Sequence, residues 1–170
     1  MKKQHGLTLV NLVLVLAVAG VILATTTPAL LRVNTRVQQH VELQDAVNQT
    51  LRSLHLALSE HWQQTQCRTA PTVNVNQLIN RYQLPSDIML TLPLLNVNID
   101  QSPNIPHLAT RLTISFDTES DMEANRISNG LKNRAVWVRA TANRITVIEP
   151  ISPIDSQFGR MNIDPTTGCY

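Results

Sequence analysis

Hydrophobic residues run almost without interruption along the beginning of the chain. Between Leu7 and Leu31 there is no charged residue, and only a few threonines and one asparagine are polar. A helix over this stretch would be about 37 Å long, and a hydrocarbon core is about 30 Å thick. The pattern therefore predicts a transmembrane helix over residues 7–31.

After Arg32 the apolar residues recur every three or four positions, apart from one wider step before Val47, with polar residues between them. The members of this stripe are Val33, Val37, Val41, Val47, Leu51, Leu54, Leu58 and Trp62. Such spacing is typical of an amphipathic helix with one apolar face. Neither Gly nor Pro occurs between residues 29 and 66. We therefore expect residues 32–66 to continue the first helix without a break.

The remaining residues, 67–170, are predicted to form a small globular head that begins irregularly. Prolines limit regular structure as far as residue 108. Within this part, Val75–Leu84 is expected to form a short helix that ends before Pro85. Ile88–Leu92 is expected to form a short strand, which Pro93 confines to an edge of a sheet.

Strand-like alternation begins at Arg111, where Leu112, Ile114 and Phe116 alternate with polar residues. Asp121–Leu131 then predicts a short helix, with Ser120 as N-cap and Glu123 three residues later. Two further strands, Ala135–Ala140 and Arg144–Ile148, are expected to form a hairpin. The predicted fold class is α+β, with a long N-terminal helix packed on a small antiparallel sheet.

The chain has 170 residues, of which 4% are aromatic, so it is long enough for one modest globular domain. Its net charge of +2 comes from Lys2 and Lys3, because the other charged residues balance. Basic residues beside an apolar span stay on the cytoplasmic side of a membrane. The charge therefore predicts a cytoplasmic N-terminus and a C-terminal part on the far side of the membrane.

The two cysteines, Cys67 and Cys169, lie far apart in the sequence. If the C-terminal part lies outside the cytoplasm, the compartment is oxidising and the two can form a disulfide. Such a bond would close a loop of roughly 100 residues and hold the end of the chain in place. Two unrelated buried thiols are the alternative.

The opening sequence KKQHGLTLVNLVLVLAVAGVILATTTPALL resembles the N-terminus of type IV pilins and of type II secretion pseudopilins. The resemblance implies a leader, residues 1–6, that prepilin peptidase removes by cutting between Gly6 and Leu7. It also implies methylation of the new N-terminus at Leu7 and a role in assembly for four further positions. These positions are Thr8, Asn11, Gly20 and Pro28.

Asn11 departs from the family pattern, which usually has Glu at this position. The resemblance assigns that carboxylate an attraction to the N-terminal amine of a neighbouring subunit, which is strong where the dielectric constant is low. Asparagine can hydrogen-bond but carries no charge. The departure therefore favours a minor pilin, placed at the filament tip or priming assembly.

The resemblance implies a pilin-like fold and a structural subunit of a type IV pilus or type II secretion pseudopilus. Its partners would be other pilin subunits, prepilin peptidase (also the methyltransferase), the assembly platform of the inner membrane, and membrane lipid. The protein would be a single-pass protein of the inner membrane with a periplasmic head. Two alternatives stay open: a pilus-borne binding module, such as an adhesin or a DNA-uptake receptor, and a single-span membrane protein outside any filament.

Other chemistry is sparse in this sequence. The five histidines have no metal-ligand spacing, and no nucleotide-binding or hydrolase motif occurs. We therefore expect no cofactor, no metal and no enzymatic activity. Trp137 and a basic run, which comprises Arg126, Lys132, Arg134, Arg139 and Arg144, raise DNA as an additional partner. The alternative for the run is a solvated strand edge that balances the acids before it.

Overall fold

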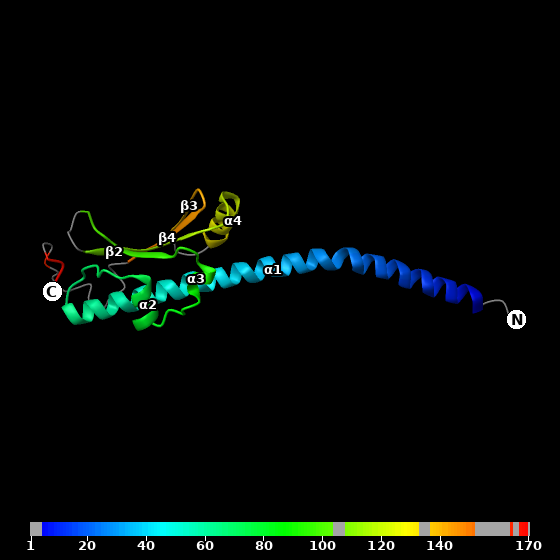
Figure 1. Cartoon of the computed structure of the whole chain (residues 1–170), viewed down its shortest axis with the longest axis horizontal. Helices are drawn as coiled ribbons and strands as arrows, with labels where there is room; N and C mark the ends of the chain where they lie inside the picture. Colours follow the sequence, from blue (N-terminus) through cyan, green and yellow to red (C-terminus); the bar gives the residue numbers. More distant parts are fainter. Residues whose placement is uncertain (1–4, 104–107, 133–136, 152–163, 165–166, 170) are drawn as a thin grey trace. The chain divides into compact units, whose positions relative to one another are not determined.

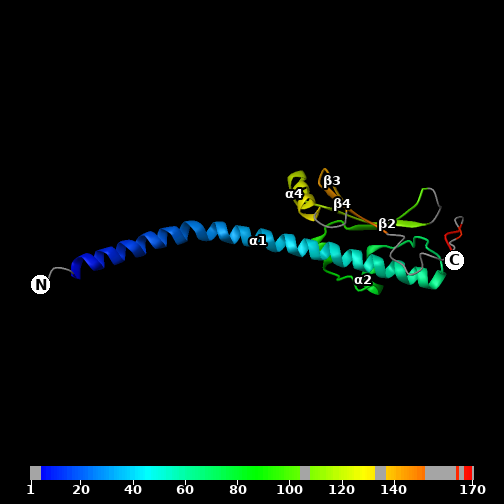
Figure 2. The same cartoon turned by 180° about the vertical axis from the view of Figure 1, so that it is seen from behind.

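The fold is taken from a computed structural model that describes residues 5–103, 108–132, 137–151, 164 and 167–169. In the first helix, side chains are described for residues 11–19, for residue 21 and from residue 37 onward. The chain divides into an N-terminal unit, residues 1–41, and a C-terminal unit, residues 42–170. In chain order the elements are α1 (His5–Thr65), α2 (Val75–Arg81), α3 (Ile88–Thr91), β1 (Asn96–Gln101), β2 (Ala109–Asp117), α4 (Asp121–Leu131), β3 (Trp137–Thr141) and β4 (Arg144–Pro150) (Figures 1 and 2).

The transmembrane part of the predicted fold is wrong. Among the described residues, no helix is both long and apolar enough to cross a membrane. The predicted single-pass position in the inner membrane, with a periplasmic head, depended on that helix and is therefore also wrong.

Helix α1 is continuous from His5 to Thr65, as the sequence without Gly or Pro after residue 28 favours. It ends where Gln66 takes a left-handed conformation with φ of 56°. The amide of Gln66 still donates to the carbonyl oxygen of Trp62, at 3.0 Å. A left-handed residue after the last turn is a common way to end a helix. The chain therefore leaves the helix at Gln66 and continues to Cys67.

The sheet has four strands in the order β1-β2-β4-β3, and every neighbouring pair is antiparallel. The hairpin predicted around Ala142 is present, with Ala142 at a φ of 53°. The α+β class, the antiparallel sheet and helix α4 agree with the sequence. Strand β1 was not predicted, because its sequence NVNIDQ has only two apolar residues among Asn, Asp and Gln, which are poor strand formers.

One face of this sheet packs on the C-terminal unit's part of α1, and together they form the core. The register places buried side chains on the same face of neighbouring strands, since Val97 pairs with Ile114 and Ile114 with Val147. Leu54 of α1, Leu112 and Phe116 are fully buried in the same cluster. The opposite face carries polar pairs such as Ser115 and Thr146. This alternation is typical of a sheet with one solvated face.

The expected strand Ile88–Leu92 is instead the short helix α3, Ile88–Thr91. A turn precedes it, in which the amide of Ile88 donates to the carbonyl oxygen of Pro85 at 3.2 Å. The helical bond from the Leu92 amide to the Ile88 carbonyl oxygen follows at 2.8 Å. Four residues are too few to show helical periodicity, so the apolar run was misread as a strand. The neighbouring helix α2 begins at Val75 as predicted but ends at Arg81, three residues before the expected end; Asn74 is its N-cap.

Candidate assembly site

The described side chains near the beginning of α1 form an apolar surface on all sides of the helix. Successive helical residues are turned by about 100°, so five consecutive large aliphatic residues encircle the axis. Seven such side chains are 51–65% exposed, and we call them the N-terminal apolar surface. Its members are Leu12, Val13, Leu14, Val15, Leu16, Val18 and Val21. A helix that is apolar all round is normally buried in a larger structure.

Asn11 lies exposed directly before this surface. Its amide is polar and uncharged, so it can offer hydrogen bonds but no ion pair to a neighbouring chain. The other predicted assembly and processing positions are Gly6, Leu7, Thr8, Gly20 and Pro28, and their backbone belongs to α1. Their side chains lie outside the described residues, so their predicted roles stay predictions.

The amphipathic stripe of α1 divides into an exposed part and a buried part. Val37 and Val41, in the N-terminal unit, are 55% and 50% exposed. In the C-terminal unit the stripe is covered by the core, and its buried members are Val47, Leu51, Leu54 and Leu58. The side chain of Val33 is not among those described. Among the described members of the stripe, Val37 and Val41 are thus exposed, and burial begins at Val47.

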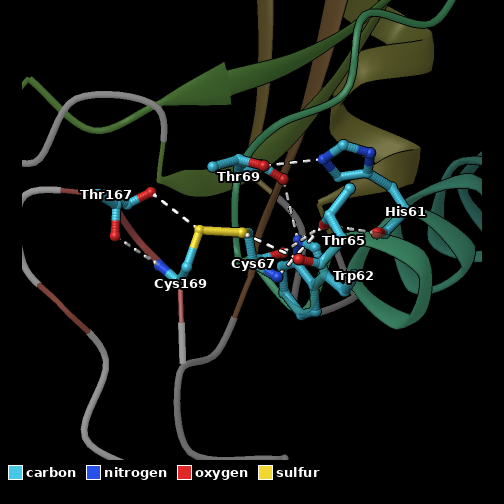
Figure 3. Close-up of a disulfide and its surroundings, with 7 residues drawn as sticks. All are labelled: His61, Trp62, Thr65, Cys67, Thr69, Thr167 and Cys169. Atoms are coloured by element: carbon cyan, nitrogen blue, oxygen red, sulfur yellow. Dashed lines mark hydrogen bonds between the residues drawn. A yellow bond between two sulfur atoms is a disulfide. The ribbon is translucent and has the colours of Figure 1, made fainter.

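The C-terminal end of the chain is fixed to the end of α1 by a disulfide between Cys67 and Cys169, which are 102 residues apart in sequence (Figure 3). The alternative of two separate thiols is thereby excluded. Polar contacts surround the bond. Thr65 donates its hydroxyl to the carbonyl oxygen of His61 at 2.7 Å, and the indole of Trp62 donates to the carbonyl oxygen of Thr69 at 3.0 Å.

The residue after Cys67 joins three distant segments of the chain. The amide of Arg68 donates to the carbonyl oxygen of Gly168 at 2.8 Å, and its carbonyl oxygen accepts from Ala109 at 3.0 Å. Its guanidinium is buried and lies 5.4 Å from the centre of the Trp62 ring. Gly168 has a φ of 72°, a conformation that glycine adopts without strain. The disulfide and these two backbone hydrogen bonds together hold the C-terminus, the end of α1 and the start of β2.

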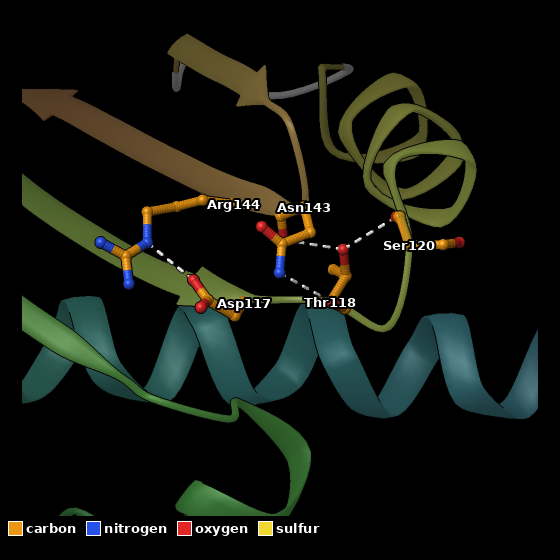
Figure 4. Close-up of polar contacts among 5 residues, drawn as sticks. All are labelled: Asp117, Thr118, Ser120, Asn143 and Arg144. Carbon is orange, nitrogen blue, oxygen red and sulfur yellow. Dashed lines mark hydrogen bonds and ion pairs between the residues drawn. The ribbon is translucent and has the colours of Figure 1, made fainter.

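A second polar cluster joins the ends of β2, β4 and α4 (Figure 4). Arg144 donates from Nε to Asp117 Oδ1 at 2.6 Å, and this hydrogen bond raises the pKa of Arg144. Thr118 donates its hydroxyl to the carbonyl oxygen of Asn143 at 2.8 Å. Ser120 caps α4 by accepting from the amide of Glu123 at 3.3 Å, as predicted. These contacts link β2, β4 and α4 at one end of the sheet.

Three of the five residues in the basic run form ion pairs or hydrogen bonds with side chains of the C-terminal unit. Arg126 pairs with Glu123, Lys132 donates to Asn129, and Arg144 pairs with Asp117, as described above. Arg139 and Trp137 are exposed on the edge strand β3, and Arg134 lies outside the described residues. Contact with DNA through these residues stays a prediction. The described part of the chain contains no group of three His, Cys, Asp or Glu residues that could hold a metal ion.

Sequence reasoning missed one apolar feature of the C-terminal unit. Met89, Leu90 and Leu94 are exposed around α3, where the sequence had been taken for part of a sheet edge. The signal was present in the run IMLTLPLL, in which apolar residues neither alternate nor follow a helical period.

No protein-family model, curated protein or solved structure matches this chain.

Proposed function

We propose that the protein is a structural subunit of a filament of the type IV pilin or type II pseudopilin kind. The N-terminal apolar surface carries this proposal, because it leaves seven large aliphatic side chains in contact with water. Burial of one such side chain contributes about 1.5–3 kcal/mol when it is complete. A surface of this kind strongly favours association. In the proposed filament, the equivalent helices of neighbouring subunits cover it.

The division of the chain into two units supports the same function. The C-terminal unit, residues 42–170, has its own hydrophobic core, and the disulfide that fixes the C-terminus also lies in this unit. A C-terminal unit with its own core leaves the N-terminal unit available for contacts between subunits. Because Asn11 carries no charge, packing of aliphatic side chains supplies most of the attraction between helices. Other pilin subunits, a prepilin peptidase and an assembly platform are the partners that this function requires.

Mass spectrometry of the protein recovered from filaments tests this proposal. We expect a chain that begins at Leu7 with a methylated amino group, because a leader ending at Gly6 would be removed before assembly. The mass of the C-terminal peptide should fit an intact Cys67–Cys169 bond. A chain that keeps Met1, and is found only outside filaments, would contradict the proposed function.

A further inference from the structure

The solvated face of the sheet carries polar side chains from all four strands. The register places one residue of each strand side by side in a row across the sheet. The members of this polar row are Asn96, Ser115, Thr146 and Arg139. Neighbouring strands lie about 4.8 Å apart, so the row is about 14 Å long. None of its four side chains has a hydrogen bond or an ion pair with another described residue.

An aromatic side chain lies beside the polar row. Trp137 pairs with Ile148, and it is two positions from Arg139 on the same face of β3. Trp137 is 67% exposed, and its indole has neither a hydrogen bond nor a ring contact with a described residue. A tryptophan ring is a large apolar surface with a negative π face, and its N–H donates one hydrogen bond. Tryptophan and arginine are also the residues that most often dominate the energy of a binding surface.

The other charges of this face are paired with one another on either side of the polar row. On one side, Arg144 Nε donates to Asp117 Oδ1 at 2.6 Å (Figure 4). On the other side, Arg111 Nε lies 3.3 Å from Asp100 Oδ2. Among the described strand residues of this face, Arg139 therefore carries the one charge that no opposite charge neutralises.

This distribution of charge separates three classes of partner. Nucleic acid carries one negative charge for each nucleotide and needs several unpaired Lys or Arg, whereas this face offers one. A protein partner needs an apolar centre, and the apolar strand residues here are Trp137 and Ile148 alone among those described. A sugar chain fits better. Its hydroxyls donate and accept hydrogen bonds, as Ser, Thr and Asn side chains do, and the C–H groups of its rings suit the π face of an indole.

We propose that the solvated face of the sheet binds an oligosaccharide that contains an acidic sugar. One sugar ring lies on the indole of Trp137, and its carboxylate accepts hydrogen bonds from the guanidinium of Arg139. The two residues are about 7 Å apart along the strand, so one sugar and its carboxylate reach both. Hydroxyls of the neighbouring sugars bind the remaining side chains of the polar row. This binding goes beyond the proposed function and does not depend on filament assembly, because all its residues belong to one subunit.

Binding of the full chain to an array of immobilised oligosaccharides tests this inference. The chain is kept in a detergent whose head group is not a sugar, so that the N-terminal apolar surface is covered. The array carries oligosaccharides of uronic acids and of sialic acids, each beside a neutral counterpart whose carboxyl group is reduced to an alcohol. We expect binding to an acidic oligosaccharide and about tenfold weaker binding to its neutral counterpart, because a hydrogen bond between charged groups is worth about that factor.

Four variants locate the binding on this face. Trp137→Ala should lower the affinity at least about tenfold, and Arg139→Gln should bind the acidic and the neutral oligosaccharide alike. Two controls lie outside the strands. Met122→Ala removes an apolar side chain that is 84% exposed on α4, and Arg52→Gln removes an exposed charge on α1, so both should bind like the wild type. Circular dichroism should be unchanged in all four, because each replaced side chain is exposed.

Three outcomes would overturn the inference. The first is that no acidic oligosaccharide binds better than its neutral counterpart. The second is that the Trp137→Ala variant binds like the wild type, which would place the site elsewhere. The third is tighter binding to oligothymidylate that weakens steeply with salt, which would assign the face to nucleic acid. Each leaves the filament function standing, because that function is tested separately by the presence of the processed chain in filaments.

Discussion

Glutamate in place of Val15 is expected to remove the protein from filaments and to leave its C-terminal unit folded. Val15 is at the middle of the N-terminal apolar surface and is 62% exposed in the single chain. In a bundle of apolar helices its replacement would bury a charge without a partner. An uncompensated buried charge costs about 3–5 kcal/mol, which corresponds to a loss of affinity of about two to three and a half powers of ten. Quantitative immunoblots of purified filaments measure this loss.

Two variants control this experiment. Val15→Leu keeps an aliphatic side chain and should enter filaments like the wild type. Gln49→Glu adds the same charge at an exposed position of α1 within the C-terminal unit, where it should have little effect. Unfolding of the C-terminal unit should be alike in all three. Normal incorporation of the Val15→Glu chain would show that this part of the helix does not pack against other subunits.

Loss of the Cys67–Cys169 bond is expected to lower the free energy of unfolding by about 2–5 kcal/mol. The bond closes a loop of 102 residues, and long loops gain most from a cross-link because the unfolded chain loses much of its freedom. The C-terminal residues should also detach from Arg68, whose amide donates to Gly168. Denaturant titration of a Cys67→Ser, Cys169→Ser double variant, followed by circular dichroism, measures the change.

The wild-type protein in a reducing agent is the matched control for this variant. It should unfold at the same denaturant concentration as the double variant, and the oxidised wild type at a higher one. Equal midpoints for all three would show that noncovalent contacts, such as the hydrogen bond from the Arg68 amide to the Gly168 carbonyl oxygen, hold the C-terminus without the covalent bond.

The elements that the sequence predicted correctly are those with strong local signals. Asp121–Leu131 has an N-cap and a helical period, and the hairpin at Ala142 lies between two apolar alternations. Strand β1 and helix α3 had no such signals, since one is polar and the other has only four residues. Strand β1 is formed by pairing with β2, a contact between segments that local patterns do not report.

The candidate site was predictable to a similar degree. The apolar run of the N-terminal helix was evident in the sequence, but its reading as a membrane span was wrong for the described residues. The two cysteines were correctly suspected of pairing, although spacing alone cannot bring two sulfur atoms together. The exposed apolar residues around α3 were missed because exposure depends on what the remainder of the fold covers. Leu90 and Leu92 are alike in sequence, yet only Leu92 is buried.

The accessibility of a thiol placed on the N-terminal apolar surface tests the central claim most directly. In a Leu14→Cys variant the introduced thiol is the only free one, because the native pair is bonded. We expect it to resist maleimide in intact filaments and to react fully after the filaments are dissociated in guanidinium. A Met122→Cys variant should react in both states. Equal labelling of Cys at position 14 in both states would contradict the account, because the helix would then be open to water within the filament.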